Sequence, residues 1–363
     1  MQKGTNEEKI VEEEEDYAEP FSVSTDSIEF QKAKRVYSLC TIFLPILIII
    51  LILSIIVYFL IKEPIENDKK VKKGTINYII KEKILVMKND SKPIILFNDH
   101  YSKFIDNITS IKINNKSIEI ANFHKFNNIG YYLVEITFNK KLKSMEDLFN
   151  HCGDIVELDL SGVDTSKVKS MKSAFSGCFK LQNITFGNFN TSSVTDMSYM
   201  FNDCHCLTSL DLYNFNTELV EDMSYMFSNA SSLKYLNVSS FNTKNVYKMQ
   251  YMFYLSNLSS IDVSNFNTEK LNYIQYMFAS CQFLTSLNLS NFNTKEVIVF
   301  DGLFKGNKNL VNIDIRNFYT TKMTSYENVF EKLPKNGSIT VNLNITSILL
   351  INQLSNKWNI ITI

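Results

Sequence analysis

The sequence is poor in the residues that mark several common classes of functional site. Only ten glycines and five prolines are scattered through 363 residues, and no glycine-rich turn leads into a helical pattern, which argues against a phosphate-binding loop. The histidines are His100, His124, His151 and His205, and no serine or cysteine nucleophile motif accompanies them. The 37 basic residues balance 38 acidic ones, so nothing points to nucleic acid. We therefore expect neither enzymatic activity nor a cofactor.

Cysteine is also sparse, and its spacing does not form a metal site. Four cysteines lie three residues after a recurring phenylalanine, and Ala230 and Ser256 hold the equivalent positions elsewhere, so the position takes a small residue. We interpret these thiols as buried, although disulfides between neighbouring repeats remain possible in an odd-numbered set. The stretch Cys204-His205-Cys206 lacks a second pair at zinc-ligand spacing, and no metal is expected. The cysteines after residue 61 are Cys152, Cys178, Cys204, Cys206 and Cys281.

What the sequence has in abundance is an internal repeat of about 26 residues. A Phe-Asn-Thr stretch ends in threonines spaced by 26 residues, or once by 25, and a second phenylalanine recurs in the same phase. Repeats of this length indicate a solenoid, because one unit cannot bury its own apolar face. The threonines are Thr165, Thr191, Thr217, Thr243, Thr268, Thr294 and Thr320, and the second phenylalanines are Phe149, Phe175, Phe201, Phe227, Phe253, Phe278, Phe304 and Phe330.

Each repeat is predicted to hold a strand, a corner and a short helix. Leu210 and Leu212 alternate with polar residues, which is typical of a half-buried strand. Thr217 is expected to cap a helix, whose apolar face has three- and four-residue steps through Val220, Met223 and Phe227. The phenylalanines of the corners (Phe189, Phe215, Phe241, Phe266, Phe292, Phe318) should stack inside. The predicted class is α/β, a leucine-rich-repeat-like solenoid of seven to eight strand-turn-helix repeats that curves with its strands on the concave side.

The repeat motif resembles a known family. The stretches TSSVTDMSYMFNDC (191–204) and LTSLDLYNFNT (207–217) are similar to the BspA-type leucine-rich repeat, which also occurs in mycoplasma surface lipoproteins. The resemblance covers about 145–333, with degenerate corners at 163–165 and 318–320. It implies a surface-exposed protein, since some members act as adhesins, and it does not identify a ligand.

The flanking regions suggest a membrane-anchored organisation. Residues 1–38 are acidic, lack a core pattern and are predicted to form a disordered tail. Residues 39–61 are an uncharged, Ile- and Leu-rich stretch that is long enough for one transmembrane helix. A charged spacer follows at 62–73. Residues 74–144 carry β-like runs and should form an N-terminal cap over the repeats of 145–333, and 334–363 should form a C-terminal cap with Trp358 over the core.

The orientation in the membrane is expected to place the N-terminus inside and the repeats outside. Lysines after the apolar stretch slightly favour the opposite arrangement, but the family resemblance favours a cell-surface, single-pass signal anchor. All the Asn-x-Ser/Thr sequences follow the stretch, which agrees weakly with an extracellular, N-glycosylated domain. These asparagines are Asn89, Asn107, Asn115, Asn183, Asn190, Asn229, Asn237, Asn257, Asn288, Asn336 and Asn344.

The candidate binding surface is the face of the strands that points away from the core. Short acidic, amide and hydroxyl groups with two tyrosines could contact a sugar or protein. The predicted function is adhesion or recognition of an extracellular protein or glycan, and the alternative is a passive surface coat or scaffold. The predicted binding residues are Asp159, Asp211, Tyr213, Tyr235, Asp262 and Asp314.

Overall fold

The structure is a computed structural model that describes residues 78–87, 92–98, 104–343 and 348–363. These belong to a compact unit, Lys73–Ile363, that is separate from Met1–Lys72. The predicted tail, transmembrane helix and spacer (1–38, 39–61 and 62–73) lie outside the described residues. Among the residues that are described, no helix has the length and apolarity needed to cross a membrane.

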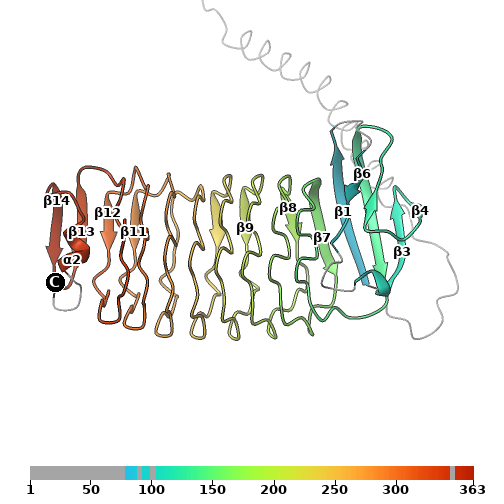
Figure 1. Ribbon diagram of the computed structural model, residues 1–363. Helices are drawn as coiled ribbons and strands as arrows, with labels where there is room; N and C mark the ends of the chain where they lie inside the picture. Colours follow the sequence, from blue (N-terminus) through green and yellow to red (C-terminus); the bar gives the residue numbers. More distant parts are fainter. Residues whose placement is uncertain (1–77, 88–91, 99–103, 344–347) are drawn as a thin grey trace, which may run out of the picture. The chain divides into compact units, whose positions relative to one another are not determined.

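The N-terminal region builds an antiparallel sheet that continues into the repeats (Figure 1). The sheet runs in the order β4-β3-β6-β1-β7-β8, where β1 pairs with both β6 and β7. Strands β2 and β5 form a separate two-stranded sheet. The buried side of the larger sheet holds alternate residues of each strand, as a half-buried sheet requires. The elements are β1 (Tyr78–Val86), β2 (Ile94–Ile95), η1 (Ile105–Asn107), β3 (Ile108–Ile113), β4 (Lys116–Ile118), β5 (Phe123–His124), β6 (Gly130–Phe138) and β7 (Ile155–Gly162).

The repeats stack as coils, and most of them carry a short parallel strand on the same side (Figure 1). The coil that contains residues 260–262 has no strand there. The central strand residues, such as Leu210 and Leu236, face each other in register and point inward, while their neighbours point outward. Isolated parallel bridges join the opposite side of every coil to the next, from Ser170–Asp196 to Val299–Ser325. The strands are β8 (Asn183–Thr185), β9 (Ser209–Asp211), β10 (Tyr235–Asn237), β11 (Ser286–Asn288) and β12 (Asn312–Asp314).

The segments that we predicted as helices are runs of tight turns. Met226 donates its amide proton to Met223 O (3.3 Å) and Ala230 donates to Phe227 O (3.4 Å), which closes four-residue turns. The amides of Met223, Tyr225 and Phe227 instead donate to carbonyls of the next coil at 2.9–3.0 Å. An α-helix would use its amides within the segment. The α/β, strand-turn-helix prediction was therefore wrong, and the described repeats form a β-solenoid.

The backbone of these turns explains why no helix forms. Two residues in each turn run have positive φ, for example Tyr225 (58°) and Asn229 (56°), whereas an α-helix needs a φ near −63° at every position. Both conformations bring every third or fourth side chain inward, so Val220, Met223, Met226 and Phe227 are fully buried in the solenoid as well. The apolar spacing was interpreted correctly as a buried face and incorrectly as a helix.

The threonines of the Phe-Asn-Thr corners link coils instead of capping helices. Thr217 is 1% exposed, and its Oγ1 donates to Asn242 O (3.0 Å) and accepts from Asn242 N (2.8 Å) in the next coil. Thr191 and Thr165 make the same pair of contacts one and two coils earlier, respectively. The expected helix cap at Thr217 was therefore wrong, and the threonine recurs because it satisfies a backbone donor and acceptor across each coil junction.

Two rows of phenylalanine rings run along the core. The predicted corner row is buried, with no member more than 6% exposed, and its rings stack at 5.9 Å for Phe189–Phe215 and 6.4 Å for Phe241–Phe266. The row from Phe149 to Phe330 stacks throughout, with centroids 5.3–6.5 Å apart. The predicted burial of the corner phenylalanines is thus confirmed, and stacking joins Phe189 to Phe215 and Phe266 to both Phe241 and Phe292. The first coil has Val163 in place of a corner phenylalanine.

The predicted curvature lacks its physical basis. Curvature in such stacks follows from a helical layer that is wider than the strand layer, but hydrogen-bonded ladders join neighbouring coils on both sides here. The outward strand residues are therefore called the strand face below, in place of the expected concave face.

The C-terminal end continues the sheet beyond the last repeat. Strand β13 (Gly337–Val341) pairs with β12 and with β14 (Trp358–Thr362). The chain that connects β13 to β14 contains α2 (Ile348–Ile351), the only α-helix in the described part of the chain. Trp358 is 6% exposed and donates its indole N–H to Pro334 O at 3.0 Å. This end of the core is therefore covered by β13, α2 and β14.

Candidate functional site

The strand face carries a middle row in which carboxylates alternate with amide or hydroxyl groups. Strand pairing places Asp159 beside Thr185, and Asp211 beside Asn237. Adjacent carboxylates on neighbouring strands would repel each other, and this alternation keeps them two coils apart. The row is Asp159, Thr185, Asp211, Asn237, Asp262, Asn288 and Asp314.

Each predicted aspartate first stabilises the end of its own strand. Asp211 Oδ1 accepts the amide proton of Tyr213 (3.0 Å), and Asp262 Oδ1 accepts that of Ser264 (2.9 Å). Asp159 and Asp314 make the same contact with the second residue after them. These local turns explain why Asp and Asn recur here, so a structural role accounts for one oxygen of each carboxylate.

The remaining contacts distinguish the four aspartates. Asn237 donates to Asp211 Oδ1 at 2.9 Å, while Arg316 occupies both oxygens of Asp314. Hydrogen bonds from Ser264 lower the pKa of Asp262. Partial burial alone would raise the pKa of Asp159, but hydrogen bonds from Ser161 lower it overall. Asp159 and Asp262 are therefore ionised at neutral pH.

Two neighbouring depressions bring together four of the six predicted binding residues. One, of about 380 Å³, is lined by Asp211 and Tyr213, and the other, of about 270 Å³, by Tyr235 and Asp262. Asn237 lines both. Asp159 and Asp314 lie outside these depressions, so the structure does not join them to the same site.

The two tyrosines are the exposed elements of this site. Tyr213 is 63% exposed and Tyr235 is 57% exposed. Tyr235 lies two residues before Asn237 and Tyr213 two residues after Asp211, so that the rings flank the Asn237–Asp211 hydrogen bond diagonally. Gly187 holds the position of Tyr213 in the preceding coil, where an added Cβ would lie 2.6 Å from Ser161. The missing side chain leaves one flank of Tyr213 open.

The candidate glycosylation asparagines occupy different surroundings. Asn183, Asn237 and Asn288 lie on the strand face, and the Asn237 side chain already bonds Asp211 and Ser239. Asn229 donates to Asp203 at 2.6 Å, and Asn257 is half-buried. Asn107 ends η1, whereas Asn115, Asn190 and Asn336 are exposed, and Asn89 and Asn344 lie outside the described residues.

Four of the five cysteines in the described residues are buried at equivalent positions of their coils. The Sγ atoms of Cys178, Cys204 and Cys281 donate to phenylalanine carbonyls of the preceding coil at 3.1–3.2 Å. Burial raises the pKa of Cys178, so that thiol is unreactive. Cys206 is exposed, and all five cysteines in the described residues are free. The same residues hold no cluster of three or more potential metal ligands.

A row of four tyrosines, which was not predicted from the sequence, lies on the side of the coils that the tight turns form. The rings of Tyr199, Tyr225, Tyr251 and Tyr276 stack with centroids 4.4–4.8 Å apart. Burial and neighbouring tyrosines raise the pKa values of Tyr225 and Tyr251 to about 12. The faces of the rings cover one another, so the row stabilises the stack and offers a ligand only edges and hydroxyls. The signal was present as a tyrosine two residues before four consecutive closing phenylalanines, Phe201, Phe227, Phe253 and Phe278.

The fold and the strand face define a repeat protein of the β-solenoid class. The model of the family described as "Mycoplasma protein of unknown function, DUF285" matches residues 143–259 and 229–343. Together these matches span more than half of the chain, and the chain belongs to this family. No curated protein and no solved structure matches the chain.

Proposed function

We propose that this protein is a surface recognition or adhesion module whose strand face binds an extracellular protein or glycan. The family membership and the finer resemblance to BspA-type surface repeats support a surface location. The apolar stretch 39–61 would anchor the chain in a single span, with residues 1–38 inside and the repeats outside. The alternative is a coat or scaffold protein without a specific ligand.

The observation that carries this proposal is the pair of exposed tyrosines across the Asn237–Asp211 contact. A tyrosine ring offers an apolar face and a polar hydroxyl at a small cost in conformational entropy, which is why tyrosine is common in binding surfaces. The main-chain and amide contacts of Asp211 and Asn237 hold the floor between the rings rigid. A rigid floor between two exposed rings is a preorganised contact surface.

The test replaces both tyrosines by the residue that the repeat itself uses there. Serine occupies the equivalent positions Ser209 and Ser239 of the neighbouring coils, so Tyr213→Ser with Tyr235→Ser should fold normally. Adhesion of residues 73–363 to cells, matrix or glycan arrays should fall at least about tenfold, as expected when central aromatic contacts are lost. Phe283→Ser is the matched control, because Phe283 is an aromatic residue that is 54% exposed and lies outside strand β11.

The other outcomes separate the alternatives. Equal binding by the double variant and the unchanged protein would exclude the strand-face site. Absence of binding to every surface would favour the coat protein. A glycan on Asn288 or Asn237 would crowd the strand face, so glycopeptide mass spectrometry that finds both occupied would move recognition to another face.

A further inference from the structure

On the side of the coils formed by the tight turns, main-chain hydrogen bonds link each coil to the next, and we call this series the turn ladder. At its C-terminal end, two backbone amides have no acceptor in the described residues. In the preceding coils, alternate amides donate to carbonyls of the next coil, as Phe300 does to Ser325 O (2.9 Å) and Gly302 to Glu327 O (2.7 Å). The equivalent amides one coil later are those of Tyr326 and Asn328. Neither has an acceptor within the described part of the chain. The turn ladder therefore ends at this coil, and the amides of Tyr326 and Asn328 point away from the preceding coil.

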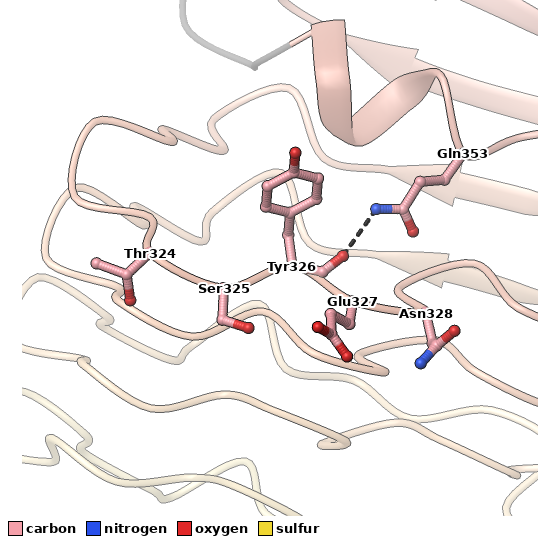
Figure 2. Close-up of a pocket in the computed structure, with 6 residues that line it drawn as sticks. All are labelled: Thr324, Ser325, Tyr326, Glu327, Asn328 and Gln353. Carbon is pink, nitrogen blue, oxygen red and sulfur yellow. Dashed lines mark hydrogen bonds between the residues drawn. The ribbon is translucent and has the colours of Figure 1, made fainter.

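A side-chain amide is already inserted at this end. In the preceding coil Leu303 N donates to Phe300 O (3.1 Å) and closes the turn. In the last coil Gln353 separates the equivalent pair, since its Nε2 donates to Tyr326 O (2.7 Å) and its Oε1 accepts from Val329 N (3.1 Å). Figure 2 shows the Gln353 side chain reaching toward the main chain of Tyr326. A primary amide has the donor and acceptor of a peptide group, so this end of the ladder already binds one peptide-like group.

A pocket of about 470 Å³ lies at the same place. Its lining is formed by the edge residues 324–328 and Gln353 (Figure 2). Glu327 is exposed there, and its amide donates to Asp301 (2.7 Å). These carboxylates oppose a phosphate or carboxylate ligand, whereas a neutral carbonyl oxygen can approach the free amides without this repulsion.

We propose that this pocket binds a peptide segment of another polypeptide, whose main-chain carbonyls accept from Tyr326 N and Asn328 N and continue the turn ladder. The established contact between coils specifies the partner: a chain that presents a carbonyl at every second residue, as residues 248, 250, 252 and 254 do toward the preceding coil. The partner's main chain is thereby added to an open hydrogen-bonding edge, by the same principle as in β-strand addition. This binding uses the C-terminal end of the turn side and is independent of the strand-face proposal.

The probe is a synthetic peptide with the sequence of residues 247–256, YKMQYMFYLS, which holds one lysine and no acidic residue. Added to the full chain, it should slow hydrogen exchange of the Tyr326 and Asn328 amides at least about tenfold. The amides of Phe300 and Gly302 should not change, because they are already bonded. The all-D peptide is the matched control, since it has the same composition and charge but adopts mirror-image backbone conformations, which change the directions of its carbonyl groups.

Several results would overturn the proposal. These are no protection at Tyr326 and Asn328 at millimolar peptide, equal protection by the all-D peptide, or binding that protects other amides instead. Asn328→Gly retains the amide and tolerates the φ of 58°, so its affinity should stay within about threefold for a main-chain contact. A large loss in that variant would indicate side-chain recognition. Protection that appears when the chain alone is concentrated would identify a second copy as the partner instead.

Discussion

Truncation of one ring in the corner row tests the solenoid core most directly. Phe241 is 2% exposed and stacks on Phe266 with centroids 6.4 Å apart and planes 9° apart. Phe241→Ala removes the whole ring from a site closed by coils on both sides. The lost transfer free energy and the cavity together should lower the free energy of unfolding by about 3–5 kcal/mol.

The measurement is urea denaturation of residues 73–363, which form a compact unit. Circular dichroism follows the whole solenoid, and fluorescence of Trp358, the single tryptophan, follows the C-terminal end. Since repeats couple mainly to their neighbours, the two transitions should separate in the variant. Phe179→Ala is the control, because Phe179 is 41% exposed and should cost about 1 kcal/mol. A loss below about 1 kcal/mol for Phe241→Ala would refute the buried spine.

Substitutions at three further positions test other features of the fold by the same denaturation measurement. Thr217→Val leaves the Asn242 amide without its acceptor and should lower the free energy of unfolding by about 1–3 kcal/mol. Thr217→Ser keeps the hydroxyl and should lower it by about 1 kcal/mol. Equal stability of the two variants would contradict the role of this hydroxyl in linking the coils. Gly302→Ala should cost about 1–3 kcal/mol, because its Cβ would lie 2.2 Å from the Tyr276 ring at a φ of +58°, and an unchanged midpoint would show that this ring moves freely. Burial raises the pKa of the unpaired Glu82 carboxyl well above its ordinary value, so the folded state keeps a proton that the unfolded state releases, and stability should fall as pH rises above that ordinary value. Glu82→Gln should therefore weaken the dependence of the free energy of unfolding on pH above the ordinary pKa of a glutamate. An identical pH dependence in both proteins would exclude Glu82 as its source.

The candidate site was only partly predictable from the sequence. The 26-residue register placed Asp211, Asn237 and Asp262 in one row, because outward strand positions repeat with the coil. It could not show that Asp314 is occupied by Arg316, or that Gly187 leaves a depression beside Tyr213. Those facts depend on side-chain contacts between residues that the repeat pattern treats as equivalent.

The sequence by itself determined the repeat length, the buried positions and the two phenylalanine rows, since apolar periodicity reports which side chains leave water. Only the tertiary structure decided between helix and turn in the stretch from Met223 to Ala230. Both conformations bury the same side chains, and they differ in where the amide protons go. Tyr225 N finds its acceptor at Gln250 O in the next coil, a partner that does not exist until the coils stack. The inter-coil hydrogen bonds then stabilise the positive φ of Tyr225 and Asn229, which an isolated segment would avoid.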